Sequence, residues 1–313
     1  MQYVLKKTGV LLATLLLVSL FAFLAFEIIP GDPTTMLLGS EYTPERAAAL
    51  RQSMGLDKNV FVRYFIWLGA FVRGDMGTSY SYSMPVREVL HGKILVTAVL
   101  SVMSWVLVTI ISMPLGVALV RYQNKPFGKI GVSANQILMA VPPFFLGILL
   151  TYLFGLLFRA FTPGKFVPFE ESIPQSLAYL LFPALAISIP KAAKTVKLLR
   201  ASILDEMKQD YVLTAYSHGN SRWMVIKSHV FRNALLPVIT YLAMSLADIV
   251  ASSIIVEQVF VVPGLGRLLV ASISNRDYPV ALCIVVMIAS VVVLMNYLAD
   301  LLTQCIDPRV RLS

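Results

Sequence analysis

Asp248 is the residue whose type and position most directly suggest chemistry. It lies inside the apolar stretch Leu246-Ala247-Asp248-Ile249-Val250-Ala251. A carboxylate inside a lipid bilayer costs a few kcal/mol unless it faces water or a partner group. Two interpretations stay open: Asp248 lines a pathway and favours a cationic solute, or it forms a structural hydrogen bond between helices. Asp300, near the end of another apolar stretch, is predicted to be structural.

The sequence lacks the motifs of an enzyme. It contains no Gly-x-x-x-x-Gly-Lys-Ser/Thr phosphate loop and no His-Glu-x-x-His metal motif. The three histidines, His91, His218 and His229, fall in predicted loops, where a solvated or hydrogen-bonded imidazole is expected. We therefore expect no catalytic, cofactor or metal site in this chain.

The composition is that of a membrane protein. Hydrophobic residues make up 58% of the 313 residues and charged residues only 14%, against roughly a quarter charged in soluble proteins. A helix needs about 20 apolar residues to cross a bilayer while satisfying its own backbone hydrogen bonds. Six stretches predict an all-α integral membrane fold with six transmembrane helices. They lie at 9–29, 94–120, 131–158, 177–190, 236–256 and 279–303.

The charge distribution predicts the orientation. With the N-terminus inside, 15 Lys and Arg fall in the inner segments and 11 in the outer ones, whereas 11 Asp and Glu are outer and four inner. The positive-inside rule then places both termini in the cytoplasm. The net charge of +9 reflects this topology, so no nucleic-acid partner is invoked.

The predicted spans divide the chain into four parts. These are a first transmembrane helix at 1–29, an extracytoplasmic segment at 30–93, a five-helix core at 94–303 and a cytoplasmic tail at 304–313. The first stretch is interpreted as a retained span rather than a signal peptide, because no small residues mark a cleavage site at its end.

Two shorter helices are predicted outside the membrane. Within 30–93, aromatic and aliphatic residues at helical spacing predict an amphipathic helix over 58–73 that packs on the bundle or lies on the membrane surface. These residues are Phe61, Tyr64, Phe65, Leu68 and Phe71. Contact with a docking protein is the alternative. Pro263-Gly264 predicts a break before a short helix at 266–274.

The inner segment 191–235 carries the most informative pattern. A basic helix is predicted to continue out of the membrane and to stop at His218-Gly219-Asn220-Ser221. Glycine suits the left-handed position after a helix, and Asn or Ser can cap the next one. Apolar residues such as Trp223 follow, so this helix–glycine–helix corner is predicted to contact either a partner protein or the lipid surface.

At these residues the chain resembles the permease subunits of ATP-binding-cassette (ABC) importers, in the branch that handles dipeptides, oligopeptides and nickel. The signature loop of that family runs Glu-Ala-Ala, three residues, Gly and later Leu-Pro. Here Leu213-Thr214-Ala215 precedes Gly219, and Leu236-Pro237 closes the loop. The first two positions depart from the general pattern, although Thr-Ala is usual in this branch.

Other motifs in the same order strengthen the resemblance over the whole chain. They are Pro30-Gly31-Asp32-Pro33, Met54-Gly55-Leu56-Asp57, Gly74-Asp75-Met76-Gly77, Pro263-Gly264-Leu265-Gly266-Arg267, Asn275-Arg276-Asp277-Tyr278-Pro279 and Asp307-Pro308-Arg309.

The resemblance implies a translocation subunit in a bacterial inner membrane. It implies a second permease subunit, two ATPase subunits that bind ATP and Mg²⁺, and an extracytoplasmic solute-binding protein. The coupling loop would comprise Thr214, Ala215, Gly219, Asn220, Ser221, Leu236 and Pro237. Peptide is the expected substrate, with nickel or a metal chelate as the alternative because of Asp248.

Two rival classes are an ion-coupled secondary transporter and a membrane-embedded enzyme. A secondary transporter is expected to show repeated halves and several buried ionisable groups. In this sequence only Asp248 and Asp300 clearly lie within spans, and no convincing internal repeat is found. Both rivals are therefore disfavoured.

Overall fold

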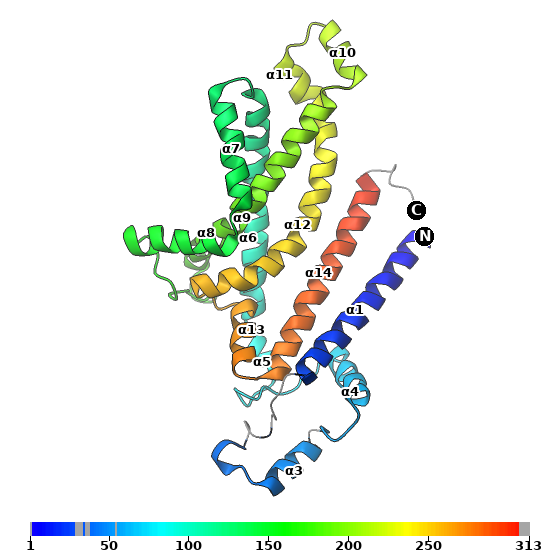
Figure 1. Cartoon of the computed structure of the whole chain (residues 1–313), viewed down its shortest axis with the longest axis vertical. Helices are drawn as coiled ribbons and strands as arrows, with labels where there is room; N and C mark the ends of the chain where they lie inside the picture. The colour runs from blue at the N-terminus through cyan, green and yellow to red at the C-terminus, as the bar shows by residue number, and fades with distance from the viewer. Residues whose placement is uncertain (1, 29–33, 35–37, 54, 307–313) are drawn as a thin grey trace. The chain divides into compact units, whose positions relative to one another are not determined.

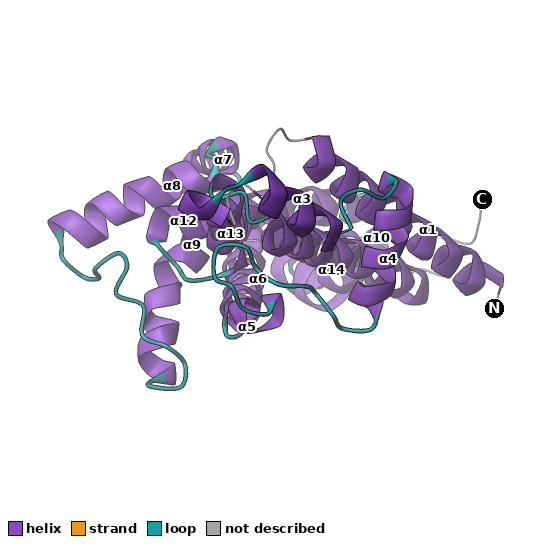
Figure 2. Ribbon diagram, turned by 90° about the horizontal axis from the view of Figure 1, so that it is seen from below, coloured by secondary structure: helices purple, strands orange, loops and turns teal. Residues whose placement is uncertain are grey.

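In a computed structural model, the chain is built from α-helices joined by loops (Figures 1 and 2). The structure describes residues 2–28, 34, 38–53 and 55–306. Within these ranges no strand occurs, and the nearest approach to one is an isolated bridge between Thr78 and Pro85. The motifs at 30–33 and 307–309, residue Met54 and most of the predicted tail lie outside the described residues.

The spanning helices account for most of the fold. Among the described residues, five helical segments are long and apolar enough to cross a membrane, and a bent pair would make six. The five contain α1 (Gln2–Ile28), α6 (Lys93–Arg121), α9 (Ile173–Glu206), α12 (Phe231–Phe260) and α14 (Tyr278–Ile306). The prediction of an all-α membrane fold is confirmed.

One predicted span is not a straight helix. The stretch at 131–158 forms α7 (Pro126–Ala140), α8 (Pro143–Leu150) and the π-helix η2 (Thr151–Leu157), with a bend of 101° after α7. The cause is the pair Pro142-Pro143. Both prolines lack an N–H, and the residue before a proline avoids the helical region. Val141 and Pro142 accordingly have extended ψ angles of 125° and 141°.

The predicted short span at 177–190 is part of a much longer helix. α9 has 34 residues and contains both Pro183 and Pro190. It is the best-covered of the spanning segments, and Leu180, Ile187 and Leu199 are fully buried. α9 packs against α7, α8 and α12, and this packing keeps the helix continuous across the two prolines. The basic part of the predicted inner segment therefore continues the span directly, but α9 ends at Glu206 and a turn at 207–209 follows. The prediction of one helix reaching His218 is therefore wrong.

The chain divides into two units, whose boundaries fall inside α6, between α12 and α13, and inside α14. The first comprises residues 1–96 and 263–293, and the second comprises 97–262 and 294–313. In the second unit, Trp105 of α6 donates its indole N–H to the carbonyl of Leu242 at 2.8 Å, and Asn135 of α7 donates to the carbonyl of Ala193 at 2.9 Å. These bonds satisfy main-chain carbonyls of α12 and α9.

The first unit contains the predicted amphipathic helix, observed as α4 (Val60–Val72). Tyr64 is buried against Phe23 of α1 and Leu282 of α14, and its hydroxyl lies 2.8 Å from that of Ser19. The other face of α4 is apolar and exposed, including Phe65. One face of α4 therefore packs on the bundle, as predicted.

The rest of the first unit includes shorter helices and a loop that is bonded to Asp277. It contains η1 (Gly39–Glu41), α3 (Pro44–Ser53), α5 (Val86–Leu90) and α13 (Leu265–Ser274), and α13 matches the helix predicted at 266–274. The carboxylate of Asp277, between α13 and α14, accepts hydrogen bonds from the Ser79 hydroxyl and from the main-chain N–H groups of Tyr80 and Ser81. Burial raises the pKa of the Tyr80 phenol to about 12.

Candidate functional site

The Gly219 corner, defined as α10 (Asp210–Ser217), residues 218–221 and α11 (Arg222–Val225), lies beyond the ends of α9 and α12 in the second unit (Figure 1). Gly219 has a φ of 80°, the left-handed conformation that the sequence predicts. Asn220 donates its side-chain N–H to the carbonyl of Ala215 at 3.0 Å. The Ser221 hydroxyl accepts from the N–H of Met224 and caps α11. These local contacts define the turn between the two helices.

The corner has a buried face and an exposed apolar face. Val212, Ala215 and Val225 are covered by the rest of the second unit. Leu213 and Met224 are 67% and 50% exposed. Thr214 is also exposed, and its hydroxyl points back to the carbonyl of Asp210. A small exposed surface of this kind is suited to contact with another protein or with lipid.

A hydrogen-bonded triad ties the corner to α9 and α12. Glu206, at the end of α9, accepts from the Tyr211 hydroxyl at 2.8 Å and from the Asn233 amide at 3.2 Å. Partial burial and the hydrogen bond to Glu206 raise the pKa of Tyr211. Because Tyr211 belongs to α10 and Asn233 to α12, Glu206 joins the corner to both long helices.

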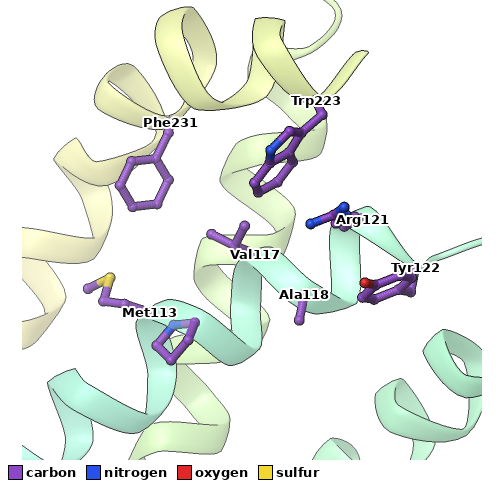
Figure 3. Close-up of a pocket in the computed structure, with 8 residues that line it drawn as sticks. Met113, Val117, Ala118, Arg121, Tyr122, Trp223 and Phe231 are labelled. Atoms are coloured by element: carbon purple, nitrogen blue, oxygen red, sulfur yellow. The ribbon is translucent and has the colours of Figure 1, made fainter. Parts of the chain in front are cut away.

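A mostly apolar pocket of about 420 Å³ separates the corner from the end of α6. Figure 3 shows Trp223 reaching from the corner toward Val117 and Arg121 of α6, with Phe231 on the opposite side. The Arg121 guanidinium lies 4.7 Å from the centre of the Trp223 ring, within the range of a cation–π interaction. The sequence predicted apolar surface at Trp223 but gave no indication that Arg121 would meet it.

The predicted Leu236-Pro237 end of the loop lies inside α12. Both residues are exposed, and Pro237 removes one helical hydrogen bond. The preceding turn, η3 (Ile226–Val230), is a π-helix. The chain thus enters α12 through two irregularities, the π-helical turn η3 and Pro237.

Asp248 lies near the middle of α12 with its side chain 71% exposed on the surface of the isolated chain. Its carboxylate oxygen is 3.9 Å from the Lys191 ammonium of α9. The sequence placed Lys191 at the edge of the inner segment and did not predict this ion pair. No group of three or more His, Cys, Asp or Glu in the described part of the chain is placed to hold a metal ion.

Glu257 is a buried acid that the sequence reasoning assigned to an outer segment. It lies inside α12, is fully buried, and accepts a hydrogen bond of 2.7 Å from the Thr97 hydroxyl of α6. Its helical spacing from Ile249, Ser253 and Phe260, which are also buried, is the signal that could have identified it.

The fold and the site together define a class of protein. It is a multi-helix membrane protein with a helical corner beyond its membrane-spanning helices. Residues 110–312 match the family described as binding-protein-dependent transport system inner membrane component, and residues 1–100 match its N-terminal region. The chain belongs to this family.

Named relatives cover the chain almost completely. It is 30% identical over 309 residues to a probable peptide ABC transporter permease protein of Sinorhizobium fredii, covering 99% of both chains. It is 32% identical to a glutathione transport system permease protein of Salmonella choleraesuis, with 99% of both chains covered. An oligopeptide transport system permease protein of Bacillus subtilis is also 32% identical, with 98% of both covered.

Proposed function

We propose that this chain is the translocation subunit of an ABC importer for short peptides, driven by ATPase subunits that bind the Gly219 corner. The observation that supports this most directly is the corner itself, because it exposes Leu213 and Met224 while being anchored to α9 and α12 through Glu206. The peptide substrate rests on the names of the relatives.

The proposed assembly contains a second permease subunit, two ATPases that hold ATP and Mg²⁺, and an extracytoplasmic solute-binding protein. The complex lies in a bacterial inner membrane with both termini and the Gly219 corner in the cytoplasm. The supporting observation is the excess of Lys and Arg in the segments on that side, 15 against 11. The segment at 30–93 then faces the binding protein.

The test is reconstitution of ATP-driven uptake of tri-alanine into proteoliposomes. The complete transporter should import the peptide, and omission of the ATPases should abolish uptake. The purified chain alone should hydrolyse no ATP. Uptake by this chain alone, driven by an ion gradient, would show that it is a secondary transporter.

Truncation of Trp223 should weaken coupling between the ATPases and the translocation subunit. Trp223→Ala removes the ring beneath Arg121 and enlarges the apolar pocket, so motion of the corner no longer reaches α6. A cation–π contact contributes about 1 kcal/mol, so we expect uptake of tri-alanine to fall about fivefold. Trp223→Phe retains an aromatic face and is the matched control. Equal uptake by wild type and Trp223→Ala would exclude this contact from coupling.

A further inference from the structure

Lys191 and Asp248 place opposite charges near the middle of two packed helices, α9 and α12. An ionisable group on a membrane-spanning helix is costly unless it is paired or hydrated, and such residues are candidates for functional sites. Their separation of 3.9 Å is an ion-pair distance but is longer than a hydrogen bond. Each group can therefore still form hydrogen bonds with a ligand.

The two groups differ in their freedom to move. The Lys191 side chain is only 12% exposed, so packing holds its aliphatic part in place. The Asp248 side chain is 71% exposed and can turn away from Lys191. Asp248 also belongs to a stripe of exposed residues along α12 that includes Met244, Ala251 and Ile255. The pair thus combines a mostly buried cation with an exposed anion.

This arrangement selects for a particular class of ligand. A metal cation attracted by Asp248 would be repelled by Lys191 at nearly the same distance. A zwitterion can satisfy both groups, because its ammonium pairs with the carboxylate while its carboxylate pairs with the lysine. Exchange of partners leaves no charge unpaired at any stage, which matters because an unpaired charge in a low-dielectric site is strongly unfavourable.

We propose that Lys191 and Asp248 form a binding station in the translocation pathway for peptides with free termini. Asp248 binds the terminal ammonium and Lys191 binds the terminal carboxylate. The proposal rests on the function proposed above and specifies its substrate class. A dipeptide spans at most ~7 Å, and the pair, 3.9 Å apart when empty, must open further to admit it between the two charges, so the station favours the shortest peptides.

The test compares three probes with the complete transporter in proteoliposomes. The probes are dialanine, N-acetyl-dialanine, which lacks the ammonium, and dialanine amide, which lacks the carboxylate. Asp248→Asn should lower uptake of dialanine and of the amide about tenfold and leave the N-acetyl form unchanged. Lys191→Gln should lower uptake of dialanine and of the N-acetyl form and leave the amide unchanged.

The solute-binding protein also discriminates between the probes. The uptake of each probe by a variant is therefore expressed relative to its uptake by the wild type with the same binding protein. Lys194→Gln, one turn further along α9 and exposed, is the matched control and should change no probe selectively. If a single variant fails to assemble, the double variant Lys191→Gln/Asp248→Asn leaves no unpaired charge. It should lose the preference for dialanine over both blocked forms, and retention of that preference overturns the proposal.

The outcomes also separate this proposal from the proposed function. Equal loss for all three probes would mean that the ion pair only ties α9 to α12, and peptide import would still stand. If the wild-type transporter imports none of the peptides but accumulates Ni²⁺ on addition of ATP, the proposed function itself fails together with the station.

Discussion

Replacement of Gly219 by valine is expected to lower ATP-driven peptide uptake about tenfold or more. The φ of 80° at Gly219 is unfavourable for any residue with a Cβ, by about 1–2 kcal/mol, and β-branched residues tolerate it least. A Cβ at this position meets no atom within 4 Å, so the effect comes from the backbone alone. The backbone at residue 219 should leave the left-handed conformation, and the hydrogen bond from the Asn220 side chain to the Ala215 carbonyl should be lost.

The matched control is Gly219→Asn, because asparagine adopts the left-handed conformation at little cost. Uptake of tri-alanine and ATP hydrolysis are measured together in the reconstituted transporter. Valine should uncouple the two, with hydrolysis continuing while uptake falls, whereas asparagine should stay close to wild type. The same loss with both variants would mean that bulk, rather than backbone conformation, matters at the corner.

Local patterns in the sequence predicted the local structure well. The glycine corner, α4 and α13 all follow from residue types within a few positions, since turn chemistry and helical periodicity act over that range. The prediction of a membrane-spanning all-α fold follows from the apolar stretches in the same way. Membrane helices are especially accessible to this reasoning because each satisfies its own backbone hydrogen bonds.

Features that depend on neighbouring helices could not be predicted. The persistence of α9 through Pro183 and Pro190 depends on packing against other helices. The Pro142-Pro143 bend could have been suspected, because two adjacent prolines interrupt the apolar stretch. Contacts between residues far apart in the sequence, such as Lys191 with Asp248 or Thr97 with Glu257, require knowledge of which helix faces meet.

The motif Asn275-Arg276-Asp277-Tyr278-Pro279 illustrates the same limit. In the sequence it indicates only a family resemblance, and the contacts of Asp277 could not be predicted from it. In the structure Asp277 is 1% exposed and joins the α13–α14 turn to a segment almost 200 residues earlier, with bonds of 3.0 Å from the Tyr80 N–H and 3.2 Å from the Ser81 N–H. The Ser79 hydroxyl donates to the same carboxylate and accepts from the N–H of Tyr82 at 3.0 Å.

Asp277→Ala should therefore strongly destabilise the first unit. The substitution leaves three donors at Ser79, Tyr80 and Ser81 without their acceptor. Ser79 is buried whereas Tyr80 and Ser81 are partly accessible to water, and a hydrogen bond to a charged group contributes about 1.5–3 kcal/mol. We expect a loss of about 3 kcal/mol or more, measured as a lower melting temperature and as faster proteolysis of the segment at 77–85 in the purified transporter.

Asp75→Ala provides the control for Asp277→Ala within the same segment. Asp75 is exposed and accepts a single bond of 2.9 Å from the N–H of Gly77, so its removal should cost no more than about 1 kcal/mol. Asp277→Asn keeps one carbonyl oxygen and should fall between the two alanine variants. If all three variants had the melting temperature of the wild type, Asp277 would not hold the segment in place. Loss of stability should follow the number of acceptor oxygens removed, because one carboxylate accepts all of these hydrogen bonds.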